Sequence, residues 1–167
     1  PTRMAEQLVE AGELRKVRQG LYFAPRKTAF GEAPPSEEEL LKAFFQGQRY
    51  LRTGPSVWNA LGLGSTAVEA VPLIYNTGRS GEVWLGRRRF RLRRVKFPPG
   101  RVPAEYLVVD LLENADLAGV DCDTVLRRLV VAVEEGRFDR ERLRVMAEGY
   151  GSKRVRLLLA RALEGCA

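Results

Sequence analysis

The sequence predicts an α+β fold, and three observations lead to this prediction. A short amphipathic helix near the N-terminus is followed by two short strands. Charged and apolar residues alternate between residues 83 and 95, as they do in strands, and apolar residues recur at helical spacing from residue 104 onward. Strands therefore gather in the first part of the chain and helices in the last, which is the pattern of an α+β protein.

The N-terminal residues 1–25 have the order of a recognition helix and its wing. Residues 4–11 are expected to be helical, with an apolar side formed by Met4, Leu8, Val9 and Ala11. Gly12 is a suitable stop because glycine adopts positive φ without strain. Two short strands about a basic turn are expected at residues 14–17 and 21–24. A helix followed by a basic two-stranded wing predicts part of a winged helix-turn-helix, which binds duplex DNA.

A linker is expected at residues 26–36. Ser36 is a suitable N-cap for a helix that opens with three glutamates, whose carboxylates complement the positive helix N-terminus. A second cap at Gly54-Pro55-Ser56 precedes a short apolar helix at 57–63. A mixed sheet should follow, with strands at 73–76, 83–85 and 89–95, and the last two strands are expected to pair as a hairpin.

The remainder of the chain is expected to be a helical bundle at residues 104–165. Its first helix covers 104–114, and each of the three later helices begins at a residue that caps well, namely Asp123, Asp139 and Ser152. Glycines at 136 and 165 are expected to end two of these helices. The second domain therefore covers residues 37–167, with the sheet reaching to about residue 100.

The charge of the chain is concentrated in one segment. The chain has 167 residues, is 45% hydrophobic, and carries 28 basic and 21 acidic residues, a formal net charge of +7. Residues 87–96 contain seven basic residues and no acidic one, so without them the chain would have 21 basic residues, equal to its acidic residues. A basic patch of this kind indicates a polyanionic partner.

Several classes of protein do not fit the composition. No apolar run approaches the length of a membrane span, and no secretory signal is visible. Cys122 and Cys166 lie far apart and match no metal spacing, so a reduced cytoplasmic compartment is expected. The chain begins at Pro1 rather than at Met, and an N-terminal piece is therefore expected to be missing.

The sequence gives no indication of catalysis. It contains no histidine, which is the commonest general base and metal ligand. It has no phosphate-binding loop, because Gly62-Leu-Gly64-Ser-Thr66 lacks the lysine that should follow, and Gly78-Arg-Ser80-Gly81 does not have the spacing of a nucleophile elbow. We therefore expect no enzyme, no cofactor and no metal site.

The expected DNA-reading residues lie in the N-terminal helix and the wing. The first turns of a recognition helix face the base edges, which would place Thr2, Arg3, Glu6 and Gln7 there. Arg3 is suited to guanine and Gln7 to adenine. The wing would bring Arg15, Lys16 and Arg18 to phosphates or to a minor groove. The structural alternative is a solvated amphipathic helix beside a basic surface hairpin.

A second candidate surface is the arginine-rich segment. Its basic residues are Arg87, Arg88, Arg89, Arg91, Arg93, Arg94 and Lys96. Strand alternation would place Arg89, Arg91 and Arg93 on one basic face. This face would be a second nucleic-acid surface, with RNA as one partner, or a surface for an acidic protein, or an edge strand protected against aggregation. The neighbouring Trp84, Phe90 and Phe97 are expected in the core.

Six segments carry a family resemblance. In chain order they are Leu8 to Tyr22, Phe30 to Ser36, Pro55 to Leu63, Leu107 to Leu112, Phe138 to Leu143 and Tyr150 to Ser152 with the closing helix. In their order and spacing these segments resemble the AbiEi-type antitoxins of bacterial type IV toxin–antitoxin systems. The resemblance extends over nearly the whole chain.

The resemblance implies both a DNA-binding and an antitoxin role. The N-terminal winged helix-turn-helix would repress its own operon by binding inverted repeats upstream. The C-terminal domain would counter a nucleotidyltransferase-like toxin without forming a stable complex with it. By position, Thr2, Arg3, Gln7, Arg15, Lys16 and Arg18 fall in the DNA-reading unit. The arginine-rich segment falls in the antitoxin domain, where its basic face would compete for the toxin's nucleic-acid target.

Three alternatives remain open from the residues alone. The first is a plain DNA-binding repressor without a toxin partner. The second is a small enzyme or accessory factor of nucleic-acid processing, which would need a pocket lined by paired carboxylates. The third is an interaction module that binds an acidic protein through residues 87–96. A monomer or a weak dimer is expected in each case.

Overall fold

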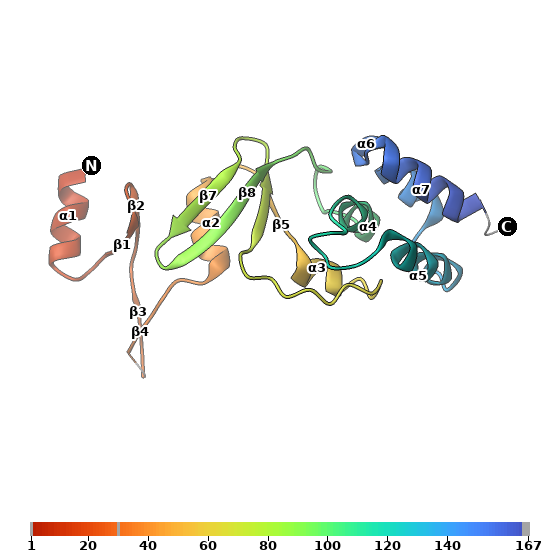
Figure 1. Cartoon of the computed structure of the whole chain (residues 1–167). Helices are drawn as coiled ribbons and strands as arrows, with labels where there is room; N and C mark the ends of the chain where they lie inside the picture. The colour runs from red at the N-terminus through yellow and green to blue at the C-terminus, as the bar shows by residue number, and fades with distance from the viewer. Residues whose placement is uncertain (1, 30, 165–167) are drawn as a thin grey trace.

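The computed structural model describes residues 2–29 and 31–164 and confirms the α+β class. The molecule is elongated (Figure 1). Helix α1 lies at one end, a four-stranded sheet lies in the middle, and the helical tail forms the other end. Within the described residues, no helix has the length and apolar character that crossing a bilayer requires.

The N-terminal helix and two strands form close to where they were predicted. Helix α1 (Thr2–Glu10) is followed by β1 (Arg15–Arg18) and β2 (Leu21–Phe23), which pair antiparallel and are called the wing below. Gly12 adopts φ 78°, and the Glu13 amide donates to the Leu8 carbonyl at 2.9 Å, so the helix ends in the expected glycine motif.

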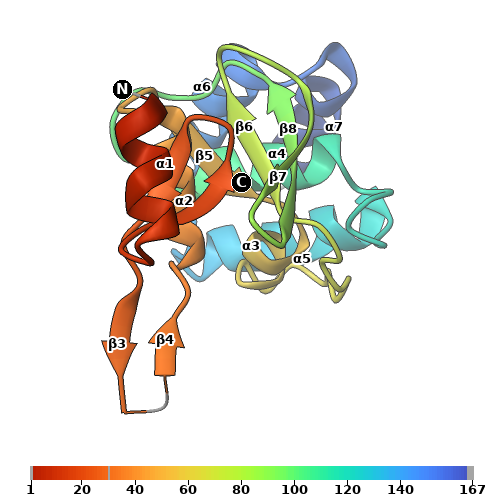
Figure 2. The same ribbon diagram turned by 90° about the vertical axis from the view of Figure 1, so that its left-hand side faces the viewer.

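Residues 26–36 are a hairpin rather than a structureless linker. Strands β3 (Arg26–Thr28) and β4 (Gly31–Ala33) pair antiparallel, and Figure 2 shows the hairpin projecting from the rest of the molecule. The Glu32 carboxylate accepts three hydrogen bonds from Arg15, and Arg26 forms an ion pair with Glu39. The strands were missed because each has only three residues and is mostly exposed, so it carries no apolar alternation.

Helix α2 (Glu37–Phe45) begins as the sequence indicates. The Ser36 hydroxyl accepts from the Glu39 amide at 3.2 Å, and the Glu39 carboxylate accepts from the Ser36 amide at 2.8 Å. This reciprocal pair is a capping box, which satisfies two amides that a helix N-terminus otherwise leaves without partners. Because Glu39 also pairs with Arg26, the start of α2 is tied to the β3–β4 hairpin.

The sheet consists of four strands and is mixed. In chain order its strands are β5 (Tyr50–Thr53), β6 (Leu73–Asn76), β7 (Gly81–Leu85) and β8 (Arg88–Arg94). The short helix α3 (Pro55–Asn59) lies between β5 and β6 in the chain. The spatial order is β5-β6-β8-β7, with β6 and β8 parallel and the other two pairs antiparallel. The predicted hairpin of the last two strands is confirmed. Strand β5 was not predicted.

The two faces of the sheet belong to two apolar clusters. One cluster joins Ile74, Phe90 and Leu92 to α2 through Leu40, Leu41 and Phe45. The other takes Leu73 and Tyr75 from the opposite face and packs them among the helices of the tail. Leu51 packs against the second cluster and Tyr50 against the first. Because both faces of β5 are covered, its sequence shows no polar alternation, which explains why it was missed.

The helical tail forms as predicted, with one change of cap. Its helices are α4 (Ala104–Glu113), α5 (Cys122–Glu134), α6 (Arg140–Tyr150) and α7 (Lys153–Glu164). Asp139 caps α6 and Ser152 caps α7, as expected. The cap of α5 is Asp121, whose carboxylate accepts from the Thr124 amide at 2.8 Å, whereas Asp123 lies inside the first turn. The expected stop at Gly165 lies outside the described residues.

A buried carboxylate joins the sheet to the tail. Asp110 on α4 accepts hydrogen bonds from the Thr53 hydroxyl of β5, from the Trp58 indole of α3 at 2.9 Å and from the Tyr75 hydroxyl of β6 at 2.7 Å. The Asn114 side-chain amide donates to the same carboxylate at 3.1 Å. One side chain thus connects three elements to the helix that carries it.

Burial and hydrogen bonding act on this carboxylate in opposite directions. Removal from water raises the pKa of Asp110 above its ordinary value, and the hydrogen bonds from Thr53, Tyr75 and Trp58 oppose that rise. The same burial, with the nearby Asp110 charge, raises the pKa of Tyr75. The Tyr75 hydroxyl therefore remains a donor to Asp110 throughout the physiological pH range.

We expect Asp110→Ala to lower the free energy of unfolding by about 2–5 kcal/mol, because it leaves several buried donors without an acceptor. Urea unfolding followed by circular dichroism would measure the change. Asp116→Ala is the matched control, since Asp116 is exposed, and its effect should stay within about 0.5 kcal/mol. Equal effects of the two substitutions would contradict the role assigned to Asp110.

Candidate nucleic-acid interface

The wing is attached to the sheet at the turn between β7 and β8. The Gly86 amide donates to the Val17 carbonyl at 3.2 Å, and Val17 and Leu21 pack against the cluster that α2 shares with the sheet. Gly86 adopts φ 63°, a left-handed conformation that glycine accepts without strain. The attachment brings the basic wing next to the start of the arginine-rich segment.

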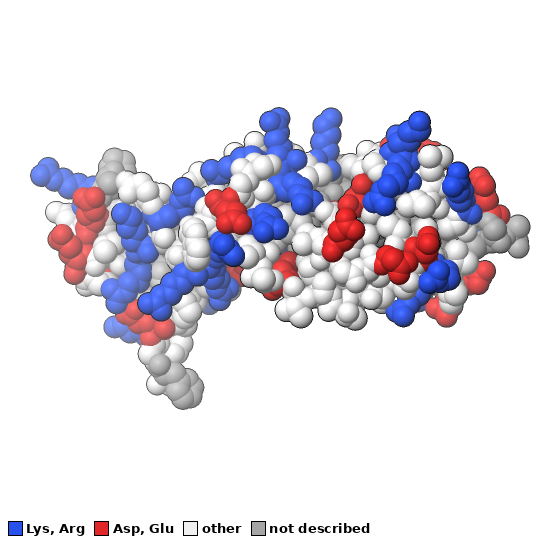
Figure 3. All heavy atoms as spheres, in the orientation of Figure 1, with Lys and Arg blue, Asp and Glu red and all other residues white. Residues whose placement is uncertain are grey.

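The wing, this turn and the β3–β4 hairpin segment line a groove of about 610 Å³. Its cationic residues are Arg15 and Lys16 from the wing, Arg87 from the turn and Arg88 from the start of β8. The rest of its lining is apolar except for Glu32 and Gly86. We call it the basic groove. In Figure 3 the Lys and Arg side chains outnumber the acidic ones over this end of the molecule, whereas the two signs are interspersed over the helical tail.

The charges of the basic groove are only partly neutralised. Arg15 lies 3.1 Å from the Glu32 carboxylate, and both side chains remain about half exposed. In the described part of the chain, no carboxylate lies within ion-pair distance of Lys16, Arg87 or Arg88. The groove can therefore offer three cations to an anionic ligand, with Arg15 held in place by its own partner.

Arg18, the third expected wing contact, has a different environment. It is partly buried, and its guanidinium carbon lies 5.3 Å from the centre of the Phe44 ring. Arg79, from the loop between β6 and β7, lies over the same ring at 4.5 Å. Arg18 thus helps to hold the wing against α2, in addition to any role it has in binding.

Helix α1 presents a polar face that carries both signs of charge. Arg3, Glu6, Gln7 and Glu10 are all exposed and share one side of the helix, while Leu8 and Val9 lie on the other and are only partly buried. The side chain of Thr2 lies outside the described ones. Two carboxylates beside one guanidinium give this face little attraction for phosphates. Most of the electrostatic attraction at this end of the molecule therefore comes from the basic groove.

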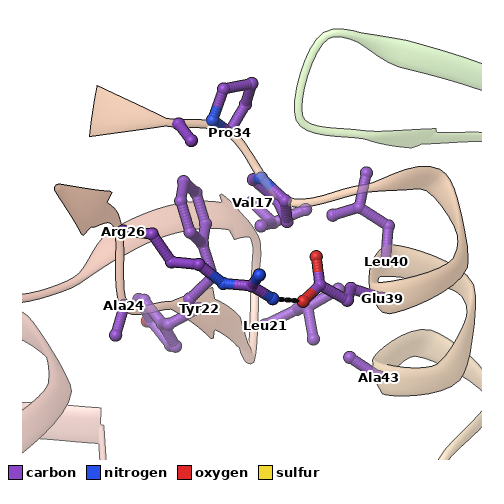
Figure 4. Close-up of a pocket in the computed structure, with 12 residues that line it drawn as sticks. Val17, Leu21, Tyr22, Ala24, Arg26, Pro34, Glu39, Leu40 and Ala43 are labelled. Carbon is purple, nitrogen blue, oxygen red and sulfur yellow. Dashed lines mark ion pairs between the residues drawn. The ribbon is translucent and has the colours of Figure 1, made fainter. Parts of the chain in front are cut away.

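A second hollow, of about 270 Å³, separates the wing from α2 (Figure 4). Val17, Leu21 and Tyr22 line it from the wing, and Leu40 and Ala43 line it from α2. The ion pair between Arg26 and Glu39 spans the space between the two sides. The wing is thus held by a few contacts around a hollow and not by a continuous packed core.

The arginine-rich segment does not form the uniform basic face that strand alternation predicted for Arg89, Arg91 and Arg93. Arg89 and Arg91 are exposed. The Glu82 carboxylate lies 3.6 Å from the Arg89 guanidinium and 3.8 Å from the Arg91 guanidinium. Arg93 is partly buried, because it donates to the Asn114 side-chain oxygen at 2.7 Å and lies over the Tyr75 ring. Arg93 therefore belongs to the network around Asp110. Arg94 and Lys96 are exposed.

The expectation for the three aromatic residues is confirmed for two and wrong for the third. Phe90 and Phe97 are buried, whereas Trp84 is 58% exposed. Strand β7 is the edge of the sheet, and the tail covers the face of β5 and β6 but leaves Trp84 open. Strand alternation in the sequence could have shown this. Val83 and Leu85 face the α2 cluster, so Trp84 between them must point to the opposite face of the sheet.

We expect Val17→Ala to weaken the attachment of the wing by on the order of 1 kcal/mol, because it removes two methyl groups from the junction. Exchange of the Gly86 amide hydrogen should become about fivefold faster, which NMR would measure. Lys16→Ala is the control, since Lys16 is exposed on the neighbouring position, and it should leave that exchange rate unchanged. Unchanged exchange in Val17→Ala would show that the wing is not held at this point.

Neither protein-family models nor curated proteins provide a match to the chain. Within the described residues, no group of three His, Cys, Asp or Glu side chains is placed to hold a metal ion. The main feature of this end of the molecule is the basic groove, which is assembled from segments distant in sequence.

Proposed function

We propose that the protein binds duplex DNA through the basic groove and the polar face of α1. The observation that carries the proposal is the groove itself, in which Arg15 and Lys16 meet Arg87 and Arg88. Four cationic residues around one groove match the regularly spaced phosphates of a nucleic-acid backbone. Because phosphate contacts position a protein without reading sequence, specificity must come from other residues.

The exposed side chains of α1 are suited to recognising the base sequence. Arg3 and Gln7 are one helical turn apart and exposed on the same face. Arginine pairs with guanine and glutamine with adenine in a major groove, and a neighbouring glutamate can accept from cytosine. In this proposal α1 reads the bases, while the wing and the β7–β8 turn bind neighbouring phosphates.

We further propose that this DNA binding serves an antitoxin and autorepressor of the AbiEi type. Support comes from the order and spacing of the six segments that resemble that family, and one of them, Leu107 to Leu112, contains Asp110. In this role the protein acts in the cytoplasm, as a monomer or a weak dimer. It represses its own operon and counters a nucleotidyltransferase-like toxin without a stable complex and without catalysis of its own.

Duplex binding is tested by fluorescence anisotropy with DNA from the upstream region of the protein's own gene and with a scrambled duplex, each at two salt concentrations. We expect the native duplex to bind more tightly by on the order of 10³. Combined Arg15→Glu and Lys16→Glu should weaken binding by more than about tenfold. The same change should reduce the salt slope by about 1.8, because two phosphate contacts are lost.

The matched control changes the same number of charges elsewhere. Lys153 and Arg156 are exposed on α7 in the helical tail, away from the basic groove. Replacing both with glutamate should leave the affinity and the salt slope almost unchanged. Equal losses in the two double variants would mean that only the total charge matters, which would reject the basic groove as the DNA site.

The antitoxin role requires a separate measurement. Co-expression with the nucleotidyltransferase-like protein encoded beside it should restore bacterial growth that the toxin alone stops. The groove variant should still restore growth, because repression and neutralisation are assigned to different parts of the chain. If the wild-type protein binds its upstream duplex but does not restore growth, it is a plain transcriptional regulator.

A further inference from the structure

Trp84 is a large aromatic side chain left open to solvent. Of the two tryptophans in the chain, Trp58 is completely buried and bonded to Asp110, whereas Trp84 is 58% exposed on the edge strand β7. The exposed part of this indole leaves apolar surface in water, and covering it with a ligand would be favourable. Its surroundings identify the kind of ligand it would suit.

Arginines surround this indole. The guanidinium carbon of Arg89 lies 5.9 Å from the centre of the Trp84 ring. Trp84 also lines two hollows, one of about 440 Å³ that it shares with Arg87, Arg88 and Arg89, and one of about 420 Å³ that it shares with Arg18 and Arg79. A single aromatic residue thus stands between two cationic hollows.

The acidic residues near these hollows offset only part of that charge. Glu37 borders the first hollow, but it accepts a hydrogen bond from Arg52 at 2.6 Å and so already has a cationic partner. Glu82 borders the second and lies between Arg89 and Arg91. Five arginines face two glutamates here, so the surface favours an anionic ligand with an aromatic part.

We propose that Trp84 is a stacking platform for a base of single-stranded nucleic acid. The phosphates of the strand would pass from Arg87, Arg88 and Arg89 in the first hollow, across the edge of β7, to Arg18 and Arg79 in the second. Aromatic side chains between basic grooves are the usual means of binding single strands, because every base has a π-face that can stack.

A duplex cannot stack a base on Trp84 in the same way. Its bases are already stacked and paired, so a side chain on an open sheet edge cannot stack on one without extracting it, at a cost of a few kcal/mol. An unpaired strand carries no such cost. The inference therefore goes beyond the proposed duplex binding and does not depend on it, although Arg87 and Arg88 border both sites.

Intrinsic fluorescence provides the test, since the exposed Trp84 and the buried Trp58 emit at different wavelengths. The full chain would be titrated with an oligodeoxyuridylate, an oligouridylate of equal length, which differs from it only in the 2′-hydroxyls, and a duplex of that length. We expect the two single strands to quench the long-wavelength emission and the duplex to leave it nearly unchanged. A difference between the two single strands would distinguish RNA from DNA as the natural ligand.

Substitutions then connect the signal to the residue. Trp84→Ala should weaken single-strand binding, measured by anisotropy of a labelled strand, by about fivefold or more. Trp84→Phe should lose the quenching but keep most of the affinity, because phenylalanine still stacks. Leu157→Ala is the control, since Leu157 is a half-exposed apolar residue on α7, and it should change nothing.

The two sites fail in distinguishable ways. Trp84→Ala should leave duplex binding intact, whereas the double substitution at Arg15 and Lys16 should weaken duplex binding and largely spare the single strand. Absence of quenching, or equal single-strand affinity in wild type and Trp84→Ala, would overturn the proposal. The exposed indole would then be assigned to a protein contact.

Discussion

The structure depends on the position of one buried carboxylate. Asp110 gathers donors from β5, α3 and β6, and through Asn114 and Tyr75 its network reaches Arg93 on β8. A carboxyl group in an apolar interior is tolerated only when its oxygens are well bonded. These hydrogen bonds fix the position of α4 on the sheet. That position determines which residues of β8 the tail covers and which stay exposed.

The two faces of the sheet are covered to different extents, and this difference determines which side chains remain exposed. Helix α2 packs on one face, while the tail packs on the other face over β5 and β6 and reaches β8 at Arg93. Arg89, Arg91 and Trp84 remain on the uncovered part, and the wing joins the same end through Val17 and Gly86. Positive charge thus collects over the sheet and the wing, whereas both signs are interspersed over the tail.

Local signals in the sequence predicted much of the fold, and non-local contacts account for most of what was missed. Ser36, Asp139 and Ser152 marked helix starts because capping needs only neighbouring residues. The pairing of β7 with β8 followed from alternation. Strand β5 and the β3–β4 hairpin gave no such pattern, since one is covered on both faces and the other is mostly exposed. The roles of Arg93 and Trp84, and the groove itself, depend on which strands the tail covers and where the wing docks.

The way in which the groove is assembled has a consequence for dissecting the molecule into fragments. Arg15 and Lys16 belong to the wing, and Arg87 and Arg88 lie some seventy residues further along the chain, yet they share one groove. A fragment cut after the β3–β4 hairpin would keep only half of these cations and would expose Val17 and Leu21 to water. Residues 1–36 thus carry one half of the groove's positive charge, and the sheet carries the other half.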